Sequence, residues 1–331
     1  MNSNLTITRI DHDDERSIGA KEAEENLFAY YGLEYQAHVV TMDEPDLRLR
    51  VLEVGSGRPV VIVPGGAGDA WPMAALMAQL KGWRMIAINR PGSGLSDGVD
   101  HRQVDLGRLA SDMVSTVADA FELDSFPIIC NSMGGLWSSW FTLEHPERVS
   151  RMVQMGCPAL ALNTSAPFFM RLIGVPGINN FIAPNMQPKD ADSALGFLRF
   201  QGSSQEHIDR MPRVAAEAAY RFYQLPTYLD TWKTLIAVVA SLTGARSKYQ
   251  LGADLLERIE QLVQFLWGDA DVFGDLEVAR QVTKIMPNAQ LHEMATGHLP
   301  YLDKPGESGR VVREFLSQET PESEPQPLAV A

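Results

Sequence analysis

Short apolar runs alternate along the chain with longer segments in which apolar residues recur at helical spacing. Runs that are apolar on both faces are typical of buried strands in a parallel sheet. We expect such strands at residues 59–63, 84–89, 126–130, 152–155, 263–267 and 289–294. The helical segments lie between them, at residues 71–80, 104–121, 134–145 and 276–286. This alternation predicts an α/β fold with right-handed crossovers and helices on both faces of the sheet.

Two regions depart from this alternation. Residues 37–42 and 47–54 are strand-length runs joined by the turn-forming residues 43–46, which predicts a hairpin. Residues 159–258 form a mostly helical block, and ten of the chain's 27 aromatic residues (6 Trp, 8 Tyr and 13 Phe) lie between residues 168 and 232. We therefore expect a helical cap inserted between two strands of one sheet. Its aromatic residues either form the core of the cap or line an apolar, enclosed pocket.

Charge is concentrated at the two ends of the chain. The 331 residues carry 42 acidic and 28 basic side chains, a net charge of −14. Residues 1–26 are rich in acids and residues 318–331 contain no base. We expect a flexible acidic segment at 1–26, a core made of 27–158 and 259–317, and a disordered tail at 318–331. The acidic balance argues against a nucleic-acid partner.

We expect the chain to carry neither a targeting signal nor a metal-binding motif. The first residues include acids and no apolar run, and no run approaches the roughly 20 residues that a membrane-spanning helix needs. Cys130 and Cys157 lack the C-x-x-C spacing of zinc or redox sites, and so few cysteines fit a reducing compartment. We expect a cytoplasmic protein without a membrane partner or bound metal. The oligomeric state stays open.

A serine follows one of the predicted buried strands directly. The run 128–131 ends at Ser132, and small residues, Cys130 and Gly134, flank the serine two positions away on each side. This pattern is that of a nucleophile elbow, in which a tight strand-to-helix turn exposes the serine hydroxyl above the sheet. The alternative is an ordinary helix start with a capping serine.

Around this turn the sequence resembles the α/β-hydrolase superfamily, over roughly residues 34–317. The resemblance implies an eight-stranded, mostly parallel sheet with the nucleophile after strand five and the helical lid between strands six and seven. Residues 131–135 also look like the elbow of hydrolases that cleave carbon–carbon bonds in meta-cleavage products, although many esterases share it.

A glycine-rich loop at residues 64–68 follows the strand 59–63. It resembles the family's His-Gly-x oxyanion loop, with Pro64 in place of the histidine. On that match the backbone N–H groups of Gly66 and Met133 would face the developing oxyanion. A phosphate cradle is the alternative, but neither G-x-G-x-x-G nor a following Gly-Lys-Ser/Thr is present.

Two later loops provide a base and an acid. Residues 297–305 look like the family's histidine loop, and the imidazole of His298 can accept a proton from serine and return it near neutral pH. Residues 268–271 resemble the Gly-x-x-Asp pattern after strand seven, which makes Asp271 the carboxylate that orients the histidine. Asp269 and Asp275 are the competing candidates. The order Ser132, Asp271, His298 is the one expected for this fold.

A further turn, residues 89–97, resembles the family's Asp-x-Arg-Gly-x-Gly-x-Ser turn. We interpret it as structural, with Arg90 and Asp97 holding neighbouring turns together by hydrogen bonds.

The identity of the residue at the elbow limits the reactions that the protein is expected to catalyse. Relatives that remove halide or open epoxides have an aspartate at the elbow, so Ser132 favours acyl transfer. We expect a serine hydrolase that cleaves a small or medium hydrophobic ester or lactone through an acyl-enzyme, without a cofactor. The expected small-molecule pocket is lined by six residues: Trp71, Leu136, Phe168, Phe169, Tyr223 and Trp232.

Two other functions remain open on the sequence. Hydrolysis of a carbon–carbon bond in a vinylogous diketone uses the same triad, but related enzymes usually have Trp after the catalytic histidine, where this chain has Leu299. A non-hydrolytic role in ligand binding or biosynthesis would retain the fold with little turnover.

Overall fold

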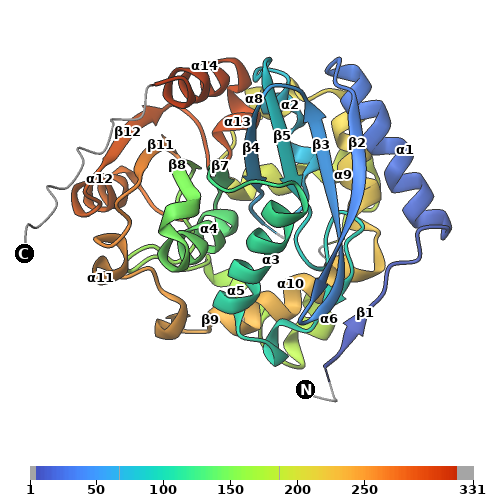
Figure 1. Ribbon diagram of the computed structural model, residues 1–331. Helices are drawn as coiled ribbons and strands as arrows, with labels where there is room; N and C mark the ends of the chain where they lie inside the picture. Colours follow the sequence, from blue (N-terminus) through green and yellow to red (C-terminus); the bar gives the residue numbers. More distant parts are fainter. Residues whose placement is uncertain (1–4, 67, 186, 319–331) are drawn as a thin grey trace, which may run out of the picture.

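A computed structural model describes residues 5–66, 68–185 and 187–318, and its centre is one eight-stranded sheet (Figure 1). The strand order is β12-β11-β8-β7-β4-β5-β3-β2. The strands are β2 (Tyr35–Asp43), β3 (Asp46–Gly55), β4 (Arg58–Val63), β5 (Trp83–Ile88), β7 (Phe126–Asn131), β8 (Val149–Met155), β11 (Leu262–Gly268) and β12 (Ala289–Met294). All neighbours from β12 to β5 are parallel, while β3 pairs antiparallel with β5 and β2. The expected mostly parallel eight-stranded sheet is confirmed.

The central strands are buried on both faces because their apolar residues supply two separate cores. Val61 of β4 and Ile128 of β7 pack into one hydrophobic cluster, and the next residues along, Ile62 and Ile129, pack into the other. Alternate side chains of a strand point to opposite faces. A continuous apolar run therefore covers both faces, as is typical of parallel strands between helices.

Helices cover both faces of this sheet. The first cluster includes residues of α3 (Leu106–Ala120), α4 (Met133–Glu144) and α12 (Leu276–Ile285), and the second includes residues of α1 (Glu15–Tyr30), α2 (Ala74–Met77) and α14 (Pro305–Leu316). Short elements complete the core: β1 (Ile7–Thr8), β6 (Gly98–Val99), α13 (Pro300–Asp303), and the 3-10 turns η1 (Trp71–Met73), η2 (His101–Gln103) and η3 (Pro146–Arg148).

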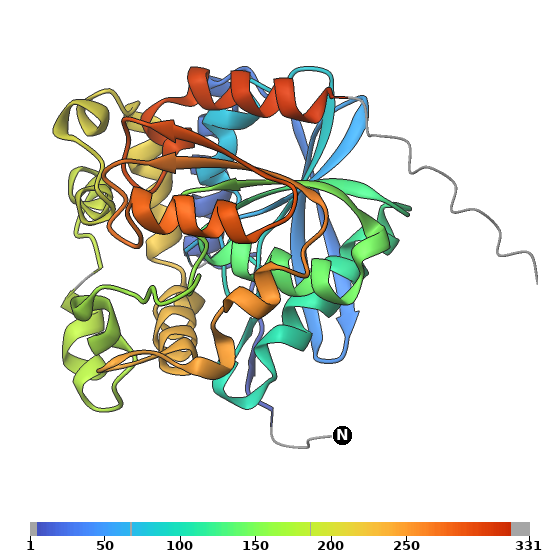
Figure 2. The same cartoon turned by 90° about the vertical axis from the view of Figure 1, so that its left-hand side faces the viewer.

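The chain between β8 and β11 is a mostly helical insertion, and Figure 2 shows its helices gathered at one side of the sheet. It comprises α5 (Phe168–Ile173), α6 (Ile178–Asn185), α7 (Ala191–Ala194), η4 (Leu195–Gln201), α8 (Gln205–Asp209), α9 (Arg213–Tyr223), α10 (Pro226–Val239), β9 (Ala240–Ser241), β10 (Gly244–Ala245), η5 (Ser247–Tyr249) and α11 (Ala253–Leu256). Its place in the chain is that of the insertion expected at 159–258.

The amino-terminal segment differs from the flexible acidic segment expected at 1–26. Within its described part, α1 starts at the N-cap Asp14 and packs against α9. Ala20 and Leu27 are buried, and Glu24 pairs with Arg50 at 2.6 Å inside the protein. The buried face of α1 combines Ala20, Ala23, Leu27 and Phe28 with the polar residues Ser17 and Glu24. This mixture gives a weak hydrophobic signal in a sequence rich in acids.

The expected tail at 318–331 lies, apart from Gln318, outside the described residues. Among the helices of the described ranges, none has both the length and the apolar character needed to cross a bilayer.

Candidate active site

Ser132 lies in the sharp turn between β7 and α4 with an unusual backbone conformation. Its φ is 50° and its ψ is −116°, which a non-glycine residue adopts only when its surroundings hold it there. A Cβ at Gly134 would collide with the carbonyl oxygen of Val63, and one at Gly135 would collide with Gln154. The turn therefore needs glycine at these positions, and it leaves Ser132 half-buried at the carboxyl edge of the sheet.

The cysteine before the serine is compatible with this crowding. Cys130 is fully buried, and its thiol lies 3.1 Å from Oε1 of Gln154. Burial raises the pKa of the Cys130 thiol to about 12 and also raises that of Cys157. Both cysteines are therefore thiols near neutral pH and serve as small packing residues.

His298 and Asp271 form a buried, directed pair at the ends of β12 and β11. Nδ1 of His298 lies 2.8 Å from Oδ2 of Asp271. The carboxylate also accepts hydrogen bonds from the backbone N–H of Cys157 at 2.8 Å and of Phe273 at 2.9 Å. These donors fix the carboxylate, which in turn orients the imidazole. Asp269, a competing candidate, has an exposed side chain, and Asp275 caps α12.

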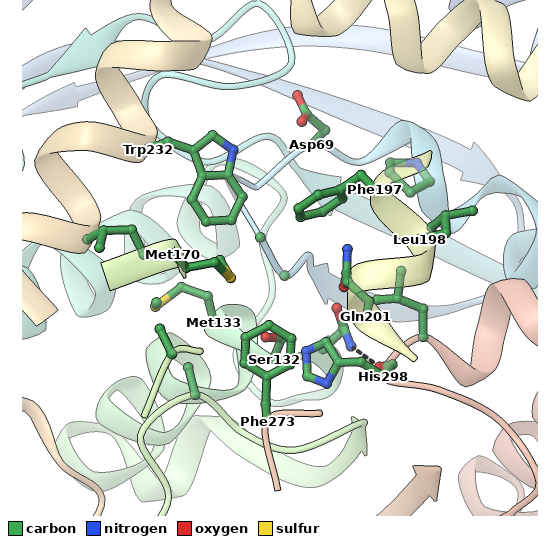
Figure 3. A pocket seen from close by; sticks show the side chains of 18 of the residues that line it. Asp69, Ser132, Met133, Met170, Phe197, Leu198, Gln201, Trp232, Phe273 and His298 are labelled. Atoms are coloured by element: carbon green, nitrogen blue, oxygen red, sulfur yellow. Dashed lines mark hydrogen bonds between the residues drawn. The ribbon is translucent and has the colours of Figure 1, made fainter. Parts of the chain in front are cut away.

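The second nitrogen of the imidazole is free. Nε2 of His298 is buried and has no hydrogen-bond partner among the described residues. Phe273 packs against the ring, with 4.3 Å between the centroids. Figure 3 shows Ser132, His298 and Phe273 at one end of a cavity, and all three residues line it. The arrangement thus offers an oriented, unpaired base beside a strained serine.

The backbone of the histidine is held from two sides. The N–H of His298 donates to the carbonyl of Gln201, in the helical insertion, at 2.7 Å. Nδ2 of Asn131 lies 3.4 Å from the carbonyl oxygen of His298, and the N–H of Gly297 donates to Asp303 at 2.7 Å. The histidine loop is therefore tied to both the elbow and the insertion.

The glycine-rich loop at 64–68, of which residue 67 lies outside the described ranges, is braced by the turn at 89–97. The Arg90 guanidinium donates to the carbonyl oxygens of Gly65 and Gly66. Gly66 has a φ of 56° and lines the same cavity as Met133. Arg90 therefore holds the backbone of Gly65 and Gly66 in place.

Asp97, the other charged residue singled out in the turn at 89–97, contacts the N-terminal segment and β3 instead of the glycine-rich loop. Asp97 is buried and accepts hydrogen bonds from the backbone N–H groups of Ile10 and Arg48, both at 2.9 Å, and from the Arg48 side chain. Burial works against its ionised form, but these bonds outweigh it and hold the pKa of Asp97 well below its usual range. Its contacts join the N-terminal segment to the core.

The cavity at Ser132 is small and apolar, about 130 Å³ in volume. Its described lining contains no lysine or arginine, and Asp69 is its only carboxyl group. Burial raises the pKa of Asp69 to about 6, although a hydrogen bond from the N–H of Gly94 opposes the shift. The electrostatic environment thus favours neutral groups over anions.

Three of the six expected pocket residues line this cavity: Trp71, Tyr223 and Trp232. Phe169 instead lines a neighbouring cavity inside the insertion. Leu136 lies outside this cavity and is fully buried in the first hydrophobic cluster. Phe168 also lies elsewhere, because it is 58% exposed at the start of α5, with Arg171 over its ring.

Several lining residues were not singled out from the sequence, including Asp69, Met170, Phe197, Gln201 and Phe273. Phe273 had a usable signal, since it lies two positions after the candidate acid. Phe197 belonged to the aromatic cluster, but nothing in the spacing separated rings that face the cavity from rings that pack the insertion.

No group of three or more histidine, cysteine or acidic side chains within the described ranges is arranged to hold a metal ion.

Comparison with known proteins agrees with this architecture. A family described as alpha/beta hydrolase fold matches residues 58–305. A 2-hydroxy-6-oxononadienedioate/2-hydroxy-6-oxononatrienedioate hydrolase of Burkholderia vietnamiensis is 25% identical, over 84% of this chain and 93% of its own. A 2-hydroxy-6-oxo-6-phenylhexa-2,4-dienoate hydrolase of Comamonas testosteroni is 24% identical, over 85% of this chain and 96% of its own.

Solved structures with the same fold include enzymes of two reaction types. A carboxylesterase from Bacillus subtilis superposes with a TM-score of 0.70 at 16% identity, covering 92% of this chain and 99% of its own. A meta-cleavage product hydrolase from Pseudomonas fluorescens superposes with a TM-score of 0.67 at 18% identity, covering 84% and 97%. At these identities the likeness shows the fold and does not choose between the reactions.

Proposed function

Because the chain belongs to the alpha/beta hydrolase fold family and is a hydrolase, we propose that it cleaves a small or medium hydrophobic carboxylic ester or lactone through an acyl-enzyme. In this proposal Ser132 is the nucleophile, His298 the general base and Asp271 the carboxylate that orients it. The helical insertion, residues 159–258, acts as the cap over the site.

The first half-reaction forms the acyl-enzyme. Oγ of Ser132 attacks the ester carbonyl carbon while Nε2 of His298 takes the hydroxyl proton. The N–H groups of Gly66 and Met133 stabilise the oxyanion, and one such donor typically contributes about 3 kcal/mol to lowering the barrier. The carbon–oxygen bond to the alcohol then breaks, and His298 returns its proton to the leaving oxygen.

The second half-reaction releases the acid. A water molecule gives a proton to Nε2 of His298 and attacks the acyl carbon, and the same N–H groups stabilise the second oxyanion. Collapse of this intermediate breaks the bond to Oγ of Ser132, which regains its proton from His298. Asp271 remains ionised throughout and stabilises the imidazolium in both halves.

The charge of the cavity is the observation that carries the choice of substrate. The relatives named for 2-hydroxy-6-oxononadienedioate act on a dicarboxylate. The cavity at Ser132 has no lysine or arginine in its described lining, and it contains the carboxyl group of Asp69. A buried carboxylate of a substrate would have no cationic partner here. This supports a neutral apolar substrate.

Carbon–carbon bond hydrolysis is the second candidate. Sequence similarity to the named dienoate hydrolases over more than four-fifths of the chain favours it. The residue after His298 is Leu299, where such enzymes usually have tryptophan. The lack of lysine and arginine in the described lining, together with the carboxyl group of Asp69, opposes an anionic substrate.

The two candidates are distinguished by one assay pair. We expect the wild type to hydrolyse 4-nitrophenyl butyrate, to leave 2-hydroxy-6-oxo-6-phenylhexa-2,4-dienoate intact, and to take one phosphonate label per chain on Ser132. Ser132→Ala should lose both labelling and hydrolysis, while Ser317→Ala, past the end of α14, should retain both. Cleavage of the dienoate without ester turnover would establish the second candidate instead.

A further inference from the structure

A second and larger cavity lies inside the helical insertion. Its volume is about 690 Å³, and its lining comes from α5, α6, α7, η4, α9 and α10. Residues found only in this cavity include Leu172, Ile173, Gly196 and Leu229. Phe200 also lines it and is 59% exposed, so the cavity extends to the surface. We call it the insertion chamber.

A wall of side chains separates the insertion chamber from the cavity at Ser132. Five residues line both spaces: Met170, Phe197, Tyr223, Tyr228 and Trp232. The rings of Phe197 and Trp232 lie edge to face, with 6.3 Å between their centroids. Each of these residues touches both spaces, so the partition is one side chain thick. Figure 3 shows Phe197 and Trp232 on the side of the cavity away from His298.

The two cavities differ in size, so they suit different parts of a substrate. Ligand pockets of about 300–1,000 Å³ accommodate a typical small-molecule ligand. The 130 Å³ at Ser132 hold little more than the reacting ester group, whereas the 690 Å³ of the chamber hold an extended chain. The insertion chamber therefore offers room beyond the shared wall for the extended part of a hydrophobic substrate.

The position of the wall indicates which part of the ester lies there. His298 must reach the leaving oxygen to protonate it, so the alcohol lies on the side of His298 and Phe273. The carbonyl group faces Gly66, and a Cβ built on Gly66 would lie 3.6 Å from the indole of Trp232. The acyl chain therefore leaves the carbonyl on the side where the wall and the chamber begin.

We propose that the insertion chamber binds the acyl chain of a medium- to long-chain ester, which enters it between Phe197 and Trp232. This inference rests on the proposed ester hydrolysis, because it assigns the chain attached to the carbonyl that Ser132 attacks. Burying each methylene in the chamber is worth about fourfold in kcat/KM until the chamber is full.

Filling the chamber tests the assignment. A Cβ at Gly196 would meet nothing within 4 Å, so Gly196→Phe adds a side chain without a clash at its base. Leu229→Trp narrows the chamber from α10. In assays of 4-nitrophenyl acetate to decanoate, we expect both variants to retain acetate hydrolysis within about twofold and to lose at least tenfold on decanoate.

Gly306→Phe is the matched control, because Gly306 also meets nothing within 4 Å and lies on α14, outside both cavities. It should retain the chain-length profile of the wild type. Equal losses on acetate and decanoate in both chamber variants, or an unchanged profile in both, would overturn the assignment. Thermal unfolding checks that each variant is folded.

A binding measurement separates this inference from the proposed reaction. Calorimetric titration of Ser132→Ala with 1-octanol should show binding that Gly196→Phe, added to the same background, weakens at least tenfold. Octanol binding without ester turnover by the wild type would leave the chamber as an apolar-chain site and remove the proposed reaction. Ester turnover without octanol binding would support the proposed reaction and remove the chamber as the site of the acyl chain.

Discussion

Backbone crowding around single glycines fixes the geometry of the candidate nucleophile. Ser132 adopts a φ of 50° because the strand before it and the helix after it converge, and Gly134 lies against two backbone carbonyls. Those carbonyls belong to β4 and the start of the glycine-rich loop, so they cannot turn aside as a flexible side chain would. The elbow thus depends on residues that carry no chemistry themselves.

Gly134→Ala should destabilise the protein and abolish activity. Its Cβ would collide with the carbonyl oxygens of Val63 and Pro64, and overpacking of this kind typically costs about 1–3 kcal/mol. Urea unfolding and 4-nitrophenyl butyrate hydrolysis measure the two effects. Gly306→Ala, where the added Cβ meets nothing within 4 Å, should leave both unchanged; a harmless Gly134→Ala would contradict the account of the elbow.

Asp271→Asn should lower kcat by about 10³-fold to 10⁴-fold, because an amide favours the wrong tautomer of the histidine. The amide nitrogen would also face one of the N–H donors of Cys157 and Phe273. Steady-state hydrolysis of 4-nitrophenyl butyrate provides the measurement. Asp269→Asn changes an exposed carboxylate in the same loop and should retain activity within about twofold. A comparable loss in both variants would remove the distinction between the two aspartates.

Residues next to strand ends were the part of the site that the sequence could predict. Ser132, Asp271 and His298 each follow an apolar run, and parallel strands bring their carboxyl ends to one edge. Leu136 and Phe168 illustrate the limit. The direction in which a helical side chain points depends on how its helix docks, and composition carries no information about docking.

At the scale of elements, the insertion and the histidine loop share a tight contact. Gly202 follows η4 with a φ of 85°, and a Cβ there would collide with the carbonyl oxygen of Ala270 and lie 3.3 Å from Gly297. The preceding residue, Gln201, accepts the hydrogen bond from the N–H of His298. The insertion is thereby part of the support of the candidate base.

Gly202→Ala should reduce kcat for 4-nitrophenyl butyrate by about tenfold or more, because displacing the histidine loop by even 1 Å spoils the alignment of base and nucleophile. Gly177→Ala is the control, since Gly177 has a similar φ of 86° but no atom within 4 Å of its added Cβ. It isolates backbone strain from displacement and should keep kcat near the wild-type value. Equal kcat values for the two variants would contradict the coupling.

Sequence periodicity predicted the elements of the core better than those of the periphery. The runs at 126–130 and 263–267 became β7 and β11 within two residues at each end, because central strands must be apolar on both faces. Less could be inferred from the sequence about where helices α1 and α10 pack. The position of α1 depends on contacts with α9, which lies about 200 residues away in the chain.

At the scale of the whole molecule, a buried histidine links the core to the insertion. His101, in η2, is 1% exposed, and its Nδ1 lies 2.9 Å from the hydroxyl of Thr234 in α10. Burial is the main cause that lowers the pKa of His101 to about 3, and the charge of Arg90 adds to it. The folded protein therefore keeps this imidazole neutral at pH values where the unfolded chain protonates it.

Stability should fall as the pH decreases below about 6.5 because of His101. Between the ordinary histidine pKa near 6.5 and the folded value of about 3, the unfolded state binds one more proton, and the free energy of unfolding drops by about 1.4 kcal/mol per pH unit. Urea unfolding from pH 7 to pH 5 measures the slope. His101→Gln should flatten it by that amount, whereas His292→Gln, at a half-exposed position, should not; identical slopes in wild type and His101→Gln would refute the assignment.

The hydrogen bond between Gln201 and His298 bears on attempts to replace the helical insertion of this protein by that of another. A chimera joined cleanly at the borders of the insertion, near β8 and β11, would replace the carbonyl on which the histidine backbone rests. The transplanted segment would first have to provide a carbonyl group equivalent to that of Gln201 and a glycine with positive φ equivalent to Gly202. Only then could it confer a new selectivity. In this protein, exchanging the insertion therefore also removes part of the support of the histidine loop.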